Sequence, residues 1–384
     1  MSTSERRVKY REIYEVLRKR IRTGEYRPGE QIPSLNQLCT AFNVSQITVR
    51  QAISALVNEG LLDRVQGKGN FVTSTPATPV TIALIFPHLY TDLETHPTAI
   101  FDRLYSIPLI GAIEQSTREQ QVNLVLWIDD DDLATERAHL QRALNRQVDA
   151  AIVFYIGEYQ NLDILNELRI SGVPLVLIDR YPAGWTGNYV VTDSFAGAHQ
   201  AVETLMHHGF TRIYFLAPQE QNSSTLSRID GVIAQLRGRS VYTDDLIKVL
   251  ASWTSTEVNQ EACAVTHEII TREPGRFALF ASNMQIFSGA CKALQERYID
   301  MSQVGLACFD TPPINMPADT TFIRVTQPLE QMGRESVRIV MEALAGRTES
   351  QQCALPPTVQ LASNHGFISL LDDMAFSRPS PAKS

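Results

Sequence analysis

Long apolar runs, cysteine and lysine are scarce in this sequence of 384 residues. No uninterrupted apolar stretch reaches the roughly 20 residues that a membrane helix needs, and the opening residues MSTSERRVKYREIY contain no apolar run. We therefore expect no membrane segment, no signal peptide and a cytoplasmic location. The five cysteines are widely spaced and form no Cys-x-x-Cys, which favours free thiols over disulfides or zinc. We expect neither a metal nor a cofactor.

Charge is distributed unevenly along the chain. The first 75 residues hold twelve Lys and Arg against seven Asp and Glu, a net +5, so with −8 for the whole chain the remainder carries −13. A basic end on an acidic body is typical of a nucleic-acid-binding region joined to a second unit. A hydrophobic content of 44% supplies apolar material for the cores of two or three domains.

The stretch 28–72 predicts two short helices followed by a hairpin. Ser34-Leu35-Asn36-Gln37 is a Ser-x-x-Gln capping box that begins the first helix, and Ser45 is the N-cap of the second. A buried stripe along the second helix leaves these side chains facing out near its N-terminus: Gln46, Ile47, Thr48, Arg50 and Gln51. Gly67-Lys68-Gly69 at the hairpin tip allows a close approach to phosphates. This order is that of a winged helix-turn-helix, whose second helix enters the major groove.

The same stretch resembles the GntR family of bacterial transcription regulators. The resemblance rests on Pro28-Gly29, Ile32-Pro33-Ser34, Leu38, Val44-Ser45, Thr48-Val49-Arg50, Ala52, Leu56, Glu59-Gly60-Leu61-Leu62, Arg64, Gly67, Gly69 and Phe71-Val72. It implies DNA contacts by Ser34, Asn36, Ser45, Gln46, Thr48, Arg50, Arg64, Gly67, Lys68 and Gly69. Family members often carry arginine where this chain has Asn36 and Gln46. Because amides pair with adenine and arginine prefers guanine, we expect an operator that differs from the usual family half-site.

From residue 80 onward, apolar strands alternate with helices, which is typical of parallel sheets covered on both faces. A long loop is expected at 88–106, before a helix that begins at Ile107. Such sheets bind ligands at the carboxyl ends of their strands.

This second region resembles the LacI-type effector domain, which has the two-lobed fold of periplasmic sugar-binding proteins. The resemblance rests on 173–180, Val191-Thr192-Asp193, Gly197, Ala201, Gly209-Phe210, Arg228-x-x-Gly231, 280–283, 304–310, 325–328 and Met332-Gly333. It implies chain crossovers between the lobes near 180–182, near Asp310 and near 326–328. It also implies effector contacts by Arg228, Trp253, Asn283 and Asp310, since carboxylates accept and arginine donates hydrogen bonds to sugar hydroxyls. Asp179 is a further candidate because it lies at the end of a predicted strand.

Other roles remain open for these residues. Ser282-Asn283 replaces the usual Asn-Asp pair, which admits an anionic sugar derivative beside a neutral sugar. Asp310 also suits a cap or hinge, Asp179 a hinge, Trp253 a core position and Arg228 a structural ion pair.

We therefore expect an α/β protein in four parts. They are a winged helix-turn-helix domain at 1–73, a linker at 74–79, a two-lobed effector domain with parallel sheets at 80–371 and a flexible tail at 372–384. Lobe 1 is expected at about 80–181 and 309–326, and lobe 2 at about 182–308 and 327–371. The expected function is a transcription repressor that binds operator DNA as a homodimer and senses a small carbohydrate-like effector.

Three alternatives remain: a regulator that senses a non-sugar metabolite, a sugar-capture receptor, and an enzyme. An aminotransferase-like enzyme needs a Schiff-base lysine, and only Lys248, Lys292 and Lys383 follow residue 75. None lies in a recognisable cofactor motif, so we expect no enzyme activity.

Overall fold

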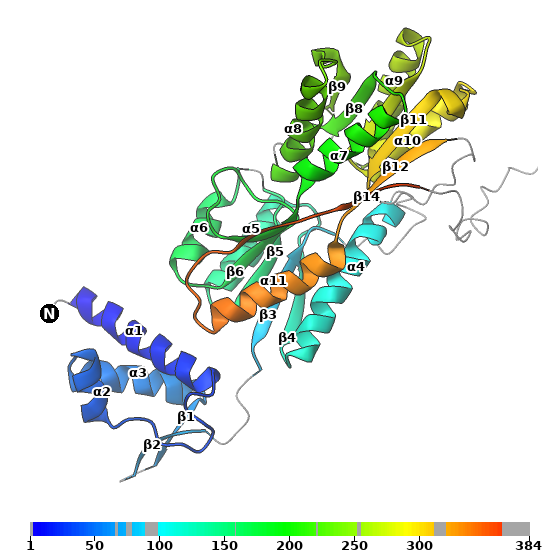
Figure 1. Cartoon of the computed structure of the whole chain (residues 1–384). Coiled ribbons are helices and arrows are strands. Elements are labelled where there is room, and N and C mark those ends of the chain that lie inside the picture. The colour runs from blue at the N-terminus through cyan, green and yellow to red at the C-terminus, as the bar shows by residue number, and fades with distance from the viewer. Residues whose placement is uncertain are drawn as a thin grey trace, which may run out of the picture.

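The computed structural model describes residues 3–65, 68–73, 79–88, 99–157, 159–219, 222–251, 255–310 and 320–362. They form a small N-terminal domain and two α/β lobes, which follow one another along the molecule (Figure 1). Several expectations lie outside these residues: the linker apart from Pro79, the hairpin residue Gly67, the side chain of Trp253, and the tail.

The N-terminal domain is a winged helix-turn-helix. It comprises α1 (Thr3–Arg22), α2 (Leu35–Phe42), α3 (Gln46–Asn58) and an antiparallel hairpin of β1 (Leu62–Val65) and β2 (Gly69–Val72). The capping box at the start of α2 is confirmed, because the Ser34 and Gln37 side chains each accept from the other residue's backbone N–H. The helices and hairpin close on a shared core of Ile13, Leu17, Leu38, Val49, Ile53, Leu56 and Leu62.

Lobe 1 is built on a six-stranded parallel sheet in the order β13-β7-β6-β5-β3-β4. Its strands are β3 (Thr81–Phe86), β4 (Asn123–Ile128), β5 (Ala150–Phe154), β6 (Leu175–Ile178), β7 (Asn188–Thr192) and β13 (Gln352–Leu355). One face packs against α4 (Ala99–Glu119) and α11 (Leu329–Leu344), and the other against α5 (Leu133–Leu144) and α6 (Leu162–Ile170). Strand β5 is buried along its whole length, as expected for an apolar run covered on both sides.

Lobe 2 carries a second sheet in the order β14-β12-β11-β10-β8-β9, in which β14 is antiparallel to β12. Its strands are β8 (Ile213–Pro218), β9 (Ile247–Leu250), β10 (Phe277–Ala281), β11 (Val304–Phe309), β12 (Thr321–Thr326) and β14 (Thr358–Leu361). Helix α7 (Ser194–His207) packs on α8 (Ser223–Gly238), and α9 (Ser255–Arg272) packs on α10 (Met284–Glu296). Single 3-10 turns at Asp244–Leu246 and Met301–Gln303 precede β9 and β11.

The crossovers between the lobes differ from the predicted ones. The chain crosses after β7, between β12 and α11, and between β13 and β14, so only the prediction near 326–328 is confirmed. Residues 180–182 instead connect β6 to β7 within lobe 1, and Asp310 follows β11 in lobe 2. The predicted lobe boundaries are therefore wrong: β12 belongs to lobe 2, whereas α11 and β13 belong to lobe 1. These assignments depend on strand pairings between distant segments, which a local apolar pattern does not show.

Helix α4 begins at Ala99, so the loop predicted for 88–106 is wrong over 99–106. Pro108 lies inside this helix, although proline removes a backbone hydrogen bond and normally marks a helix boundary. The longer helix carries Tyr105 to the junction of the two lobes.

Candidate functional site

The N-terminal half of α3 presents polar side chains to solvent. Gln46 and Arg50 are exposed, and Gln46 Nε2 donates to Asn36 Oδ1 of α2 over 3.0 Å. The two amides that replace the family arginines therefore form one pair at the surface. Thr48 was expected to face out, but it is only 3% exposed. It precedes the buried Ala52 by four residues, which places it on the inner stripe, and its hydroxyl lies 3.0 Å from that of Ser45.

The hairpin adds positive charge beside this face. Arg64 and Lys68 are exposed, as are Ser34 and Ser45 at the starts of the two helices. Gly69 has a φ of 120°, and a Cβ there would lie 2.5 Å from Gln31 Nε2, which donates to the Lys68 carbonyl over 2.7 Å. The hairpin itself thus requires glycine at position 69. DNA contact by these residues stays a prediction.

One arginine joins the N-terminal domain to lobe 1. Arg18 Nε lies 2.9 Å from Glu59 Oε1 at the end of α3, and its Nη2 lies 3.1 Å from Asp149 Oδ1 at the start of β5. The other oxygen of Asp149 accepts from the backbone N–H of Thr81, the first residue of β3, over 2.9 Å. The Tyr14 hydroxyl donates to Glu59 over 2.5 Å. Nothing in the sequence pattern indicated this connection between α3 and the sheet of lobe 1.

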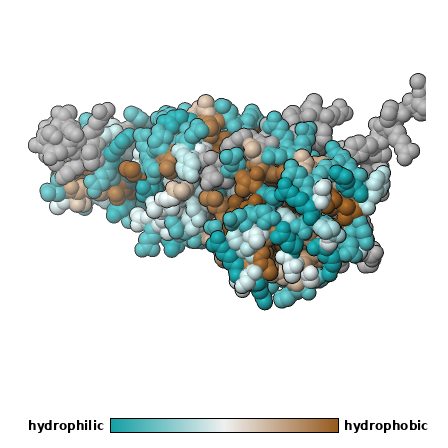
Figure 2. All heavy atoms as spheres, turned by 90° about the horizontal axis from the view of Figure 1, so that it is seen from above, coloured by the Kyte–Doolittle hydropathy of each residue, from teal (hydrophilic) through white to brown (hydrophobic). Residues whose placement is uncertain are grey.

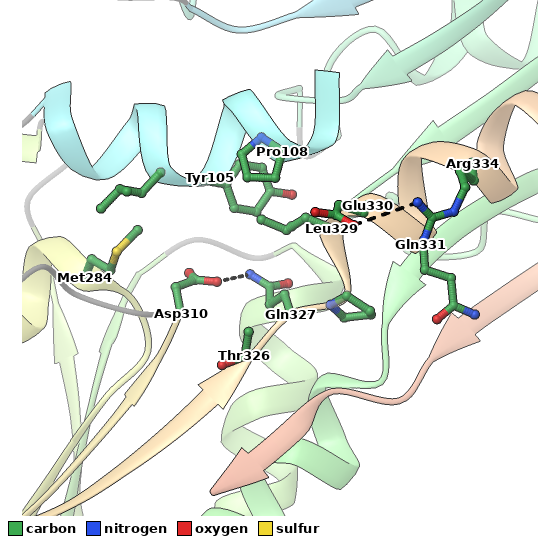
Figure 3. Close-up of a pocket in the computed structure, with 12 residues that line it drawn as sticks. Tyr105, Pro108, Met284, Asp310, Thr326, Gln327, Leu329, Glu330, Gln331 and Arg334 are labelled. Atoms are coloured by element: carbon green, nitrogen blue, oxygen red, sulfur yellow. Dashed lines mark hydrogen bonds and ion pairs between the residues drawn. The ribbon is translucent and has the colours of Figure 1, made fainter. Parts of the chain in front are cut away.

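A cavity of about 450 Å³ lies between the lobes beside the second crossover (Figure 3). Tyr105 of α4 and Leu329 of α11 line it from lobe 1, and Met284 and Asp310 line it from lobe 2. Asp310 Oδ1 accepts from Gln327 Nε2 over 2.8 Å, and Gln327 Oε1 accepts from the Thr192 hydroxyl over 2.7 Å. Asp310 is therefore tied to two of the segments that cross between the lobes.

Asp179 lies deeper, at the carboxyl end of β6, and is 4% exposed. Its carboxylate accepts from the Tyr105 hydroxyl over 2.6 Å and from Arg180 Nε over 2.9 Å, and its carbonyl accepts from the Ser224 hydroxyl of lobe 2 over 2.5 Å. Burial and the Asp179 charge raise the pKa of Tyr105. Asp179 and Asp310 are both left-handed, with φ of 69° and 70°, a backbone strain that is common at ligand sites. Tyr105 was not predicted as a site residue, because it lies in the segment predicted as a loop.

Arg228 of α8 faces Asp310. Its Nη1 donates to the Ser282 carbonyl over 2.6 Å, and its guanidinium carbon lies 4.1 Å from the centroid of the Phe309 ring. Burial raises the pKa of Asp310, while the charge of Arg228 opposes that rise. The structure thus brings Asp179, Arg228 and Asp310 into one neighbourhood. Asn283 differs, because its side-chain oxygen accepts from the Ile286 N–H and caps α10.

A second buried acidic pair lies at the carboxyl end of β4. Asp129 is 1% exposed, its Oδ2 has no hydrogen-bond partner among the described residues, and burial followed by the charge of Glu136 raises its pKa to about 8. An unfolded aspartate ionises near pH ~3.9, so between about pH 4 and about pH 8 the folded state binds more protons than the unfolded state. The free energy of unfolding should therefore fall as pH rises, by at most about 1.4 kcal/mol per pH unit.

Asp129→Asn should remove this contribution of Asp129 to the pH dependence of the free energy of unfolding. Urea unfolding of the wild type and the variant at about pH 5 and about pH 7.5 measures it, since the difference between the two proteins cancels other titrating groups. The variant should gain stability relative to the wild type at the higher pH. Parallel pH profiles would show that Asp129 is ionised in the folded protein.

Comparison with family models agrees with this architecture. A model of bacterial regulatory proteins of the gntR family matches residues 9–72, and a periplasmic binding protein domain model matches residues 104–349, more than half of the chain. The chain belongs to the periplasmic binding protein domain family. Its periplasmic-binding-protein-like domain follows a GntR-type helix-turn-helix domain, which confirms both resemblances seen in the sequence.

Curated relatives of this two-domain protein are transcription regulators. The arabinose metabolism transcriptional repressor of Halalkalibacterium halodurans is 21% identical over 350 residues, which are 88% of this chain and 89% of that protein. The transcriptional repressor NagR of Bacillus subtilis is 28% identical over 171 residues, 42% of this chain and 69% of NagR. Relatives from Escherichia coli and B. subtilis that are 49–53% identical over 65 or 66 residues are matched over only 27% of their own length.

Solved structures with the same fold include sugar complexes. The transcriptional regulator CelR with cellobiose has a TM-score of 0.61 at 19% identity, over 86% of this chain and 99% of CelR. Cra of Pseudomonas putida with fructose 1-phosphate has a TM-score of 0.59 at 20% identity, over 73% and 98%. At these identities the likeness shows the fold. Among the described helices, none combines the length and apolar character needed to cross a bilayer.

Proposed function

We propose that the protein is a transcription repressor whose affinity for operator DNA is controlled by a small carbohydrate-like effector between its lobes. The observation that supports this most is the cluster of buried and half-buried polar side chains at the lobe junction, namely Asp179, Tyr105, Arg228 and Asp310. It belongs to a chain that also presents an exposed helix-turn-helix face. The repressor names of the relatives and the sugars in the similar complexes support the same class.

The chemistry of the network suits a polyol. Sugar hydroxyls donate to carboxylates such as Asp310 and accept from guanidinium groups such as Arg228. Because the Asn283 oxygen is used in a helix cap, we place the binding role on Asp179, Arg228 and Asp310 rather than on Asn283. A non-sugar metabolite with the same donor and acceptor pattern is the alternative effector.

Control of DNA binding would follow from the connections already described. An effector that bridges the lobes would bias their relative position about the three crossovers, which is a hinge motion. The contact of Arg18 with Asp149 would then carry a change in lobe 1 to Glu59 at the end of α3. This gives two sites and two states, as allostery requires.

A homodimer would present two DNA-binding domains to a palindromic operator. Apolar side chains are exposed on α4 and on the edge strand β4, namely Leu104, Ile107, Val125 and Leu126, at 36–63% exposure. Figure 2 shows that hydrophobic groups interrupt the otherwise hydrophilic surface of the molecule.

The fused DNA-binding domain disfavours the sugar-capture receptor, and the relatives named above are regulators rather than enzymes.

The first experiment is a thermal-shift screen of the full chain against neutral sugars, sugar phosphates and sugar acids, followed by operator binding with each hit. A ligand that binds only the folded state raises the melting temperature by mass action. We expect a hit that changes operator affinity by about 5–150-fold. Operator binding without any sugar hit would reject the carbohydrate class. A hit that leaves operator affinity unchanged would reject the repressor mechanism.

A further inference from the structure

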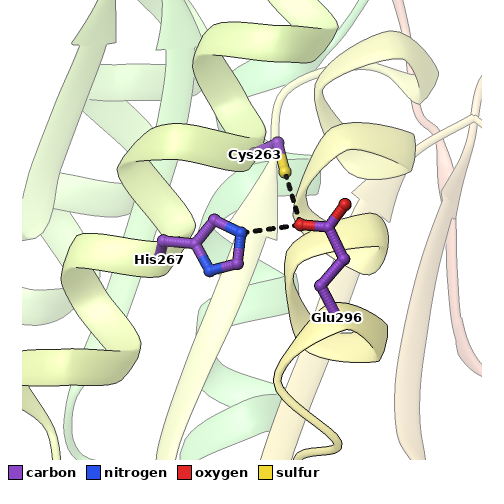
Figure 4. A group of neighbouring side chains, drawn as sticks. All are labelled: Cys263, His267 and Glu296. Carbon is purple, nitrogen blue, oxygen red and sulfur yellow. Dashed lines mark hydrogen bonds and ion pairs between the residues drawn. The ribbon is translucent and has the colours of Figure 1, made fainter.

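Three side chains of metal-binding type converge on lobe 2 (Figure 4). Cys263 and His267 are four residues apart on α9, so they lie one above the other on one face of the helix, and Glu296 is the last residue of α10. Their donor atoms all lie within 4.8 Å of one another. Met284, the first residue of α10, lines the cavity between the lobes, and Glu296 lies at the other end of that helix, about 20 Å away. The cluster is therefore distinct from the effector site.

We propose that Cys263, His267 and Glu296 bind one divalent ion of the zinc class. Thiolate, imidazole and carboxylate ligands are those that zinc prefers, and metal–ligand distances of about 2.0–2.3 Å predict tetrahedral donor separations of about 3.3–3.7 Å. The observed separations are 2.8 Å from His267 Nε2 to Glu296 Oε2 and 3.8 Å from Cys263 Sγ to the same oxygen. The remaining separation, from Cys263 Sγ to His267, is at most 4.8 Å, so shifts on the order of 1 Å would bring the three donors to tetrahedral spacing. Three protein ligands leave the fourth position to water.

The backbone holds the two ligand-bearing helices at a fixed spacing. A Cβ at Gly289 of α10 would lie 2.1 Å from the Asn259 carbonyl oxygen of α9, so the helices approach as closely as glycine allows. The Asn259 side chain then donates to the Gln285 carbonyl over 3.0 Å. A metal site on such rigid elements needs little reorganisation to bind its ion.

The metal-free cluster is closed by hydrogen bonds that the ion would replace. The Glu296 carboxylate accepts from His267 and from the Cys263 thiol, and Arg297 Nε lies 3.2 Å from His267 Nδ1. On binding, the thiol releases its proton to solvent, the imidazole proton moves to Nδ1, and the exposed Arg297 turns away. The cations Lys292 and Arg297 flank the site.

The test uses the metal-free full chain, titrated with Zn²⁺ against a chromogenic chelator and with Co²⁺ as a spectroscopic probe of thiolate coordination. We expect one bound equivalent per chain and a thiolate-to-cobalt charge-transfer band. Cys263→Ser and His267→Gln should each abolish the tightly bound equivalent of zinc. Cys263→Ser should also abolish the charge-transfer band of the cobalt complex. His267 is only partly buried, so His267→Gln should preserve the fold even if the cysteine variant does not.

Cys353→Ser is the matched control, because Cys353 is another free thiol but lies on β13 of lobe 1. This variant should keep both the zinc equivalent and the cobalt band. The proposal is overturned if the wild type binds no stoichiometric zinc, or if zinc binding persists unchanged in both Cys263→Ser and His267→Gln.

Discussion

Arg228→Met should weaken effector binding by at least ~100-fold, while operator binding by the effector-free protein stays within about twofold of the wild type. The substitution removes the cation that faces Asp310 and leaves the Ser282 carbonyl without its 2.6 Å hydrogen bond. Methionine preserves the apolar bulk over the Phe309 ring. Calorimetry with the effector found by screening and fluorescence anisotropy with labelled operator measure the two affinities.

Arg50→Ala is the matched control with the reverse expectation. Arg50 is exposed on α3 and belongs to the predicted DNA-binding face, so its loss should cost about 1–3 kcal/mol of operator binding and leave effector binding unchanged. If either variant loses both activities while remaining folded, the assignment of separate sites is wrong.

Asp149→Asn should uncouple the two sites. The amide still accepts from the Thr81 N–H, but the charge that pairs with Arg18 across the domain boundary is gone. We expect each ligand to bind alone with near wild-type affinity. The factor by which the effector changes operator affinity, about 5–150-fold in allosteric proteins, should fall toward one. Operator titrations with and without saturating effector give that factor directly.

Asp163→Asn provides the matched control for this loss of charge. Asp163 pairs with Arg137 over 2.6 Å, but both residues lie within lobe 1 and are largely exposed. The coupling factor should therefore survive in this variant. An Asp149→Asn protein that responds to the effector as strongly as the wild type would show that the signal reaches α3 by another route.

Local signals allowed the N-terminal domain and many of the strands to be predicted from sequence. The Ser34 capping box needs only four consecutive residues, and the strands at 81–86 and 150–154 are continuous apolar runs. Both kinds of signal can be read from a short segment of the chain, without knowing which segments it contacts in the folded protein. Asp179, Arg228 and Asp310 also follow strands or lie in motifs that carry the family resemblance, and the structure brings them near one another. Their contact with an effector stays a prediction.

The predictions that were wrong concern features that depend on tertiary packing. Thr48 lies beside the apolar residues of α3, so a small rotation of the helix about its axis determines whether its side chain is buried or exposed. The crossovers depend on whether short strands such as β7 and β12 pair with one sheet or the other. Helix α4 begins at Ala99 rather than at the predicted Ile107, and it packs along α11, a long-range contact that a local pattern does not show. The contact of Arg18 with Asp149 joins residues that are 131 positions apart, which no local pattern encodes.

The placement of β13 and β14, the last strands among the described residues, has a consequence for how the protein is made. Strand β13 completes the edge of the lobe 1 sheet and β14 the edge of the lobe 2 sheet, although both lie within residues 352–361. During synthesis from the N-terminus, the DNA-binding domain can fold as soon as it leaves the ribosome. Neither lobe can close its sheet until residues 352–361 have emerged. A nascent chain therefore acquires its DNA-binding face long before it can form the junction that would control it.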